Sequence, residues 1–168
     1  MLSNSIGVIH LIASIIALIA GSLVLKNRKG TKIHKKTGYM YTIAMTIVLT
    51  TSFMIYRLHG AFGILHWFAV ISSITLLAGM LPMFFKKPSN YMNLHSSFMY
   101  WSVIGLYCAF FAEVLTRIPF LLEVEDNITV VFYVMVGVAT GVVAGIGSYF
   151  FRRFKKKWNA FTTDFEGK

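Results

Sequence analysis

Five long apolar segments, separated by short polar connections, constrain this chain more than any other feature of its sequence. They cover roughly residues 6–25, 32–57, 62–85, 94–116 and 128–153. A helix needs about 20 mostly apolar residues to cross the hydrocarbon core of a bilayer. Backbone polar groups must pair within the segment in lipid, so these segments predict helices. We therefore expect an all-α membrane protein, a four-helix transmembrane bundle with a fifth transmembrane helix.

The composition and the length fit the same interpretation. The 168 residues are 57% hydrophobic and 13% charged, whereas an ordinary soluble domain is about half apolar and about a quarter charged. This length accommodates five spanning helices and little else. We expect a single transmembrane domain over residues 1–158 and a short cytoplasmic tail over residues 159–168.

The basic residues predict how the chain is oriented in the membrane. They cluster in the first connection, in the third connection and after the last apolar segment: Lys26, Arg28, Lys29, Lys32, Lys35, Lys36, Lys86, Lys87, Arg152, Arg153, Lys155, Lys156 and Lys157. Cytoplasmic loops carry an excess of Lys and Arg. The amino terminus is then outside and the carboxy terminus cytoplasmic, in a multi-pass protein of the bacterial cytoplasmic (inner) membrane. The same rule accounts for the net charge of +10 without nucleic acid as a partner.

Four histidines occupy matched depths when the predicted helices are laid antiparallel. His10 and His66 lie near the outer ends of the first and third helices, and His34 and His95 begin the second and fourth at the cytoplasmic boundary. In a bundle whose consecutive helices are neighbours, each pair is diagonal across the centre. Imidazole nitrogens are axial ligands of haem iron. The pairs predict two b-type haems, and the outer one is the more secure because the inner pair lies at helix ends.

The two predicted haem levels would be about 20 Å apart at 1.5 Å of rise per residue, a separation suited to electron transfer across the membrane. The single Cys108 cannot form an internal disulfide, and the chain has no Cys-x-x-Cys-His motif. Any haem is therefore expected to be held without a covalent attachment.

Glu113 allows two interpretations. It lies near the predicted level of His10 and His66, and an intramembrane carboxylate requires a partner. One interpretation is a pair with Arg117, four residues further along the same helix. The other is a functional role in which Glu113 orients a ligand histidine or relays protons.

A metal site is the alternative to haem. Zinc accepts imidazole and carboxylate ligands, so His10, His66 and Glu113, with His59 from the outer connection, could form the site of an intramembrane hydrolase or metal-binding protein. This alternative does not explain the inner histidine pair. The chain also lacks a His-Glu-x-x-His motif.

Two further features concern partners. Gly137, Gly141 and Gly145 form a face that permits close helix packing, against the bundle, a second copy or a larger complex. A homo-oligomer through this face, or a non-catalytic assembly subunit, is therefore a third hypothesis. The cations around His34 could attract a quinone or another small redox donor, although topology alone demands the same cations. Membrane lipid is the remaining expected partner.

The pattern Lys29-Gly-Thr-x-x-His34-x-x-x-Gly38, together with His66-Trp67 and the later His95 and Glu113, resembles a family of small bacterial membrane proteins of unassigned function. The histidine pairing also resembles the two-haem transmembrane cytochromes b. That second resemblance implies ligand roles for the four histidines, and electron transfer from a cytoplasmic-side donor to an external acceptor, which would make the protein a transmembrane oxidoreductase. The sequence departs from those cytochromes in having a fifth helix without histidine.

Overall fold

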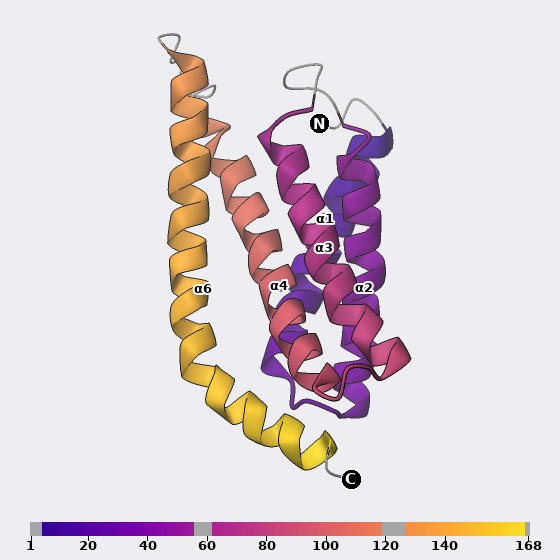
Figure 1. Cartoon of the computed structure of the whole chain (residues 1–168). Helices are drawn as coiled ribbons and strands as arrows, with labels where there is room; N and C mark the ends of the chain where they lie inside the picture. The colour runs from indigo at the N-terminus through magenta and orange to yellow at the C-terminus, as the bar shows by residue number, and fades with distance from the viewer. Residues whose placement is uncertain (1–4, 56–61, 119–126, 167–168) are drawn as a thin grey trace. The chain divides into compact units, whose positions relative to one another are not determined.

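Five α-helices make up the regular structure of the part of the chain that the computed structural model describes, residues 5–55, 62–118 and 127–166, with side chains described as far as residue 159 (Figure 1). The helices are α1 (Ser5–Lys26), α2 (Lys32–Ser52), α3 (Ile64–Phe85), α4 (Tyr91–Leu115) and α6 (Ile128–Glu166). No strand occurs among these residues. The prediction of an all-α membrane protein is confirmed.

Four of the helices are long and apolar enough to cross a membrane: α1, α3, α4 and residues Ile128–Asn159 of α6. The protein is therefore a multi-pass membrane protein by length and composition. α2 is 21 residues long, enough for about 31 Å, but it is less apolar. The crossing by α2 and the orientation of the termini stay predictions.

Lys32, His34, Lys35 and Lys36 account for most of the lower hydropathy of α2, and its threonines add a smaller part. Five threonine hydroxyls donate to the carbonyl four residues earlier in the same helix, those of Thr37, Thr42, Thr46, Thr50 and Thr51. Each hydroxyl is thus satisfied inside the helix without a neighbouring chain. A hydropathy scale penalises these side chains although they need no water.

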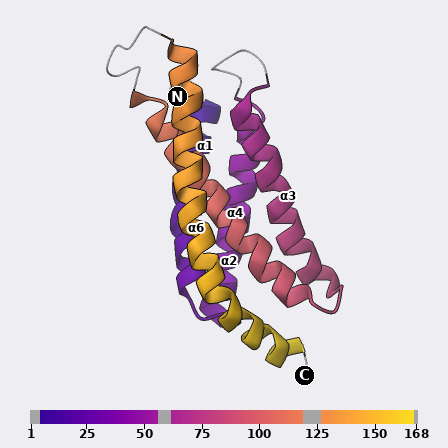
Figure 2. The same ribbon diagram turned by 60° about the vertical axis from the view of Figure 1, so that its left-hand side comes forward.

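Helix boundaries differ from the predicted ones at three places. α2 ends at Ser52 rather than near residue 57, and α4 begins at Tyr91 rather than residue 94. α6 continues to Glu166, well beyond residue 153, so the expected tail is helical over most of its length (Figure 2). The loss of apolar residues marks where lipid ends, and a charged segment remains free to continue the helix.

The contacts divide the chain into two compact units, residues 1–78 and 79–168. In the first unit, α1 packs on α2 through a face of small residues, Ala13, Ala17, Ala20, Gly21 and Val24, all of them buried. Small side chains let two membrane helices approach closely. Larger buried residues of α2, including Tyr41, Met45 and Val48, complete this core.

The connection between α1 and α2 is ordered by local hydrogen bonds. Thr31 is the N-cap of α2, and its hydroxyl oxygen accepts the backbone N–H of His34 at 3.2 Å. Gly30 has a φ of 78°, which glycine adopts without strain. Lys29 folds back, and its Nζ donates to the carbonyl of Val24 at 3.2 Å, near the end of α1. The half-buried ammonium group of Lys29 therefore lies against the last turn of α1.

Burial lowers the pKa of Lys29 from 10.5 to about 8. The unfolded chain then binds more protons than the folded protein between these values, so stability should rise as the pH increases from about 8 to 10.5. We expect the melting temperature of the detergent-solubilised protein to rise between pH 7 and 9.5 relative to that of a Lys29→Met variant. Lys32→Met, at an exposed position, is the control and should follow the wild type. Parallel pH profiles for wild type and Lys29→Met would contradict the assignment.

In the second unit, α4 packs along α6. The buried α6 residues Phe132, Val136 and Ala139 recur every three or four positions on one face. Further along, the hydroxyl of Tyr100 donates to the carbonyl oxygen of Gly147 at 2.7 Å. A Cβ on Gly147 would lie 2.9 Å from Ile104 Cγ2. Glycine at this position is therefore what permits the close approach of the two helices.

Candidate histidine site

The site predicted from the sequence consists of histidines, and their hydrogen bonds decide which ring nitrogen carries the proton. In neutral imidazole one nitrogen donates and the other holds a lone pair. A metal binds the nitrogen with the lone pair, and the opposite N–H of such a histidine almost always donates to an oxygen acceptor. The tautomers are therefore assigned below from the partners of each ring.

His10 lies in the second turn of α1, and its Nδ1 is 2.8 Å from the hydroxyl oxygen of Thr51 near the end of α2. The Thr51 hydroxyl itself donates to the carbonyl of Ile47 at 2.7 Å. Because its single hydrogen is used there, Thr51 accepts a hydrogen from His10 Nδ1. We assign His10 the Nδ1–H tautomer, in which Nε2 has the lone pair.

His95 has the same Nδ1–H tautomer as His10, but its hydrogen-bond partner is different. Its Nδ1 is 2.8 Å from the carbonyl oxygen of Gly79, in the last part of α3. A carbonyl can only accept, so the hydrogen is on Nδ1 and the lone pair on Nε2. Both His10 and His95 are thus in the form that ligates iron or zinc.

His66 is in the opposite form. Its Nδ1 accepts the backbone N–H of Gly63 at 3.1 Å, and its own backbone N–H donates to the Gly63 carbonyl at 3.0 Å. This reciprocal pair resembles a capping box, with His66 in the place usually taken by Glu or Gln. His66 is only 7% exposed, and its ring stacks on that of Phe62 with centroids 4.9 Å apart. The neutral ring then carries its hydrogen on Nε2, the nitrogen that an axial ligand would use.

The other histidines are less defined. His34 is half-buried in the first turn of α2, where its backbone is held by Thr31. His34 and His95 belong to different units, so their pairing stays a prediction. His10 and His66 belong to the same unit. His10 bonds to Thr51 and His66 bonds to Gly63, so neither of the hydrogen bonds described above joins the two histidines. His59 lies outside the described residues.

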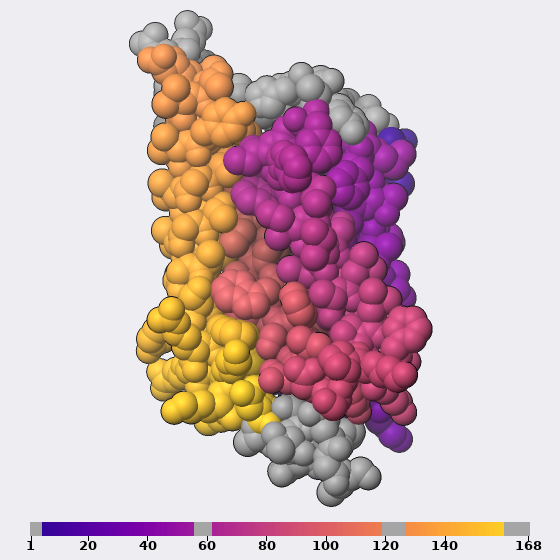
Figure 3. Space-filling model, viewed as in Figure 1, coloured from indigo at the N-terminus to yellow at the C-terminus, as the bar shows by residue number. Residues whose placement is uncertain are grey.

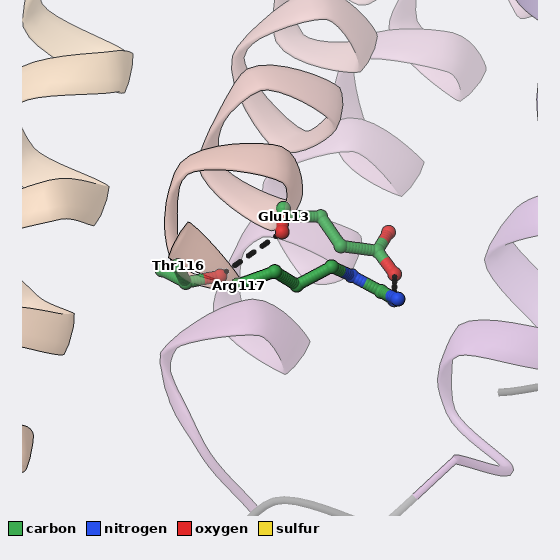
Figure 4. A network of polar contacts seen from close by, with 3 residues as sticks. All are labelled: Glu113, Thr116 and Arg117. Atoms are coloured by element: carbon green, nitrogen blue, oxygen red, sulfur yellow. Dashed lines mark hydrogen bonds and ion pairs between the residues drawn. The ribbon is translucent and has the colours of Figure 1, made fainter. Parts of the chain in front are cut away.

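Glu113 pairs with Arg117, as one of the two interpretations predicted (Figure 4). Glu113 Oε1 is 2.6 Å from Arg117 Nη2, and the Thr116 hydroxyl donates to the Glu113 carbonyl oxygen at 3.2 Å. The carboxylate is thus neutralised on its own helix, which meets the requirement for a partner at membrane depth. A further role of Glu113 as ligand orienter or proton relay stays a prediction.

The zinc alternative gains no support from the part of the chain that the structure describes. Within residues 5–55, 62–118 and 127–166, no group of three or more His, Cys, Asp or Glu side chains could hold a metal ion. Its fourth predicted ligand, His59, lies outside those ranges.

The sequence analysis missed Thr51 and Gly79 as histidine partners. Both could have been found, because two consecutive antiparallel helices place residues at equal distances from their connection at the same level. Thr51 ends the helix that follows the one bearing His10, so the two share a level in the hairpin. Gly79 and His95 are related in the same way across the α3–α4 turn. Gly79 also lies close to Met99, because a Cβ there would stand 2.8 Å from the sulfur and 3.2 Å from the backbone nitrogen.

Comparison with known proteins identifies a family for this chain. No curated protein and no solved structure matches the chain. A family model described as a predicted membrane protein (DUF2306) matches residues 7–150, most of the chain. This agrees with the apolar helices and with the expected membership in a membrane family of unassigned function. The chain therefore belongs to the DUF2306 family of predicted membrane proteins.

Proposed function

We propose that the protein is a b-type membrane cytochrome that moves electrons across the membrane between a cytoplasmic-side donor and an external acceptor. His10 and His95 are its primary axial ligands, one at each of two haem levels. His66 and His34 are the partner ligands that the sequence pattern assigns to those levels. The observation that carries the proposal is the pair of Nδ1–H bonds, from His10 to Thr51 and from His95 to Gly79.

These hydrogen bonds fit what haem ligation requires. An N–H donated to oxygen fixes the orientation of the ring and makes the opposite nitrogen a stronger ligand. Both acceptors are held firmly, because Thr51 is bonded to its own helix and Gly79 belongs to the α3 backbone. A bound haem would supply a reversible one-electron centre. The contribution of the chain is to present Nε2 and to exclude water with apolar helices.

The positions of the two histidines support a transmembrane route. His10 is near the start of α1 and His95 near the start of α4. If each of the first four helices crosses the bilayer, α1 and α4 begin on opposite faces. The two primary ligands are then close to opposite surfaces.

The proposal requires a rearrangement at His66. Ligation through its Nε2 needs the hydrogen on Nδ1, so the backbone N–H of Gly63 would have to find another acceptor. Gly63 immediately precedes α3, at a helix end where water can take over such a bond. The contacts therefore support His66 less strongly than His10.

Electron transfer can be measured with the full chain in sealed liposomes. Ferricyanide is trapped inside, and ascorbate, which crosses membranes poorly, is added outside. We expect trapped ferricyanide to be reduced in liposomes that contain the haem-replete protein, and much more slowly in those with His10→Ala. A rate equal to that of protein-free liposomes, or one unaffected by His10→Ala, would count against a transmembrane route.

A further inference from the structure

One face of α6 is open along the part of the helix that contains three evenly spaced glycines. Gly137, Gly141 and Gly145 are exposed, and, apart from adjacent residues and the local helix backbone, no heavy atom of the described residues lies within 4 Å of the place where a Cβ would stand. At 100° per residue they lie on the side of the helix away from Val136 and Ala139, which are buried. The three glycines leave a trough about 12 Å long on this face of α6, the helix whose atoms Figure 3 draws in orange to yellow.

The trough continues into a cationic concavity. This concavity has a volume of about 540 Å³ and is lined by Gly145, Ser148, Tyr149, Arg152 and Arg153. Gly145 thus belongs to both features. Arg153 Nη1 donates to the Tyr149 hydroxyl at 3.4 Å, which leaves the hydrogen of that hydroxyl directed elsewhere. Two guanidinium groups and two hydroxyls therefore surround one space at the end of an apolar trough.

We propose that this surface binds an anionic phospholipid, with the phosphate at Arg152 and Arg153 and an acyl chain along the glycine trough. Guanidinium groups match phosphate oxygens with paired hydrogen bonds. Basic residues at the end of a transmembrane helix attract anionic headgroups. A single amphiphile uses both features at once, whereas a soluble anion would leave the trough without a role.

Charge also argues against a second copy of the chain as the occupant. Copies inserted in the same orientation would pack their glycine faces in parallel and bring Arg152 and Arg153 against the same residues of the partner. Residues 128–159 of α6 contain no Asp or Glu to compensate these cations. Like charges placed together oppose such an interface.

The first test measures lipid selectivity by native mass spectrometry of the purified full chain, titrated with phosphatidylglycerol or with phosphatidylcholine. Wild type should retain phosphatidylglycerol preferentially, and R152Q/R153Q should lower this preference about tenfold. K156Q/K157Q removes the same charge from residues that do not line the concavity, and it should behave as wild type. An equal loss of the preference for phosphatidylglycerol in both double variants, or no loss in either, would overturn the proposal.

The second test concerns the trough and identifies the occupant. Gly141→Leu should fill the trough and weaken phosphatidylglycerol retention, whereas Val142→Leu, at an exposed apolar position beside it, should not. If Gly141→Leu left lipid retention unchanged and instead lowered the fraction of dimer, the face would belong to a second copy and the lipid proposal would be wrong.

Discussion

His95→Ala is expected to abolish the inner haem signal, and His10→Ala the outer one, while the rest of the spectrum survives. Each change removes an axial nitrogen whose opposite N–H is already bonded to a fixed oxygen, Gly79 O or Thr51 Oγ1. The alanine side chain has no atom that can coordinate iron in place of this nitrogen. Reduced-minus-oxidised absorption spectra of the two purified variants, scaled to protein concentration, measure the effect.

Thr51→Val distinguishes positioning from general damage. This variant keeps the His10 ligand and removes the acceptor of its Nδ1–H, so we expect haem to remain bound. Its reduction potential should rise, because the imidazole donates less charge to iron without that hydrogen bond. Thr46→Val is the matched control, since Thr46 bonds to the carbonyl of Thr42 on its own helix and is exposed. An unchanged potential in Thr51→Val, or equal shifts in both variants, would contradict the assigned tautomer of His10.

Gly147→Leu should strongly destabilise the second unit. Its Cβ would be placed 2.9 Å from Cγ2 of Ile104, with Cγ1 and Cδ1 at 3.2 and 3.3 Å. Overpacking of this kind costs about 1–3 kcal/mol, and loss of the Tyr100 hydrogen bond to the Gly147 carbonyl would add about 1 kcal/mol. Thermal unfolding in detergent, followed by circular dichroism, measures the change.

The controls for this prediction use the same residue types. Gly141→Leu makes an identical substitution where nothing lies within 4 Å of the new Cβ, and it should lower the melting temperature little. Ile104→Ala, combined with Gly147→Leu, removes the atoms that clash and should recover part of the lost stability. If Gly147→Leu and Gly141→Leu melted at the same temperature, the close contact between α4 and α6 would be disproved.

The number and positions of the helices follow from the sequence because lipid imposes a single requirement on every span. Backbone groups in lipid must pair within a helix, so a run of about 20 apolar residues is sufficient to identify a spanning helix. The end of α6 did not follow, since its basic residues mark the limit of the hydrocarbon without stopping the helix. The formation of α2 as a helix also followed from the sequence, whereas its crossing of the membrane stays a prediction, because lysines at its start lower its hydropathy.

The histidine site was only partly predictable for a different reason. Depth along a helix follows from residue number, which brought His10, His66, His34 and His95 forward as candidates. The proton position in each ring depends on atoms far away in sequence, such as Thr51 for His10. His66 shows the limit most clearly, because a local capping bond to Gly63 assigns its proton to Nε2. Gly63, three residues before His66 at a helix start, is a signal that sequence inspection can use in similar chains.

Haem content of the purified wild-type protein tests the central claim most directly. After expression with ample haem supply, the pyridine haemochrome assay should give b-type haem at close to two per chain, with low-spin Soret and alpha bands after reduction. A colourless protein without pyridine haemochrome under the same conditions would contradict the account.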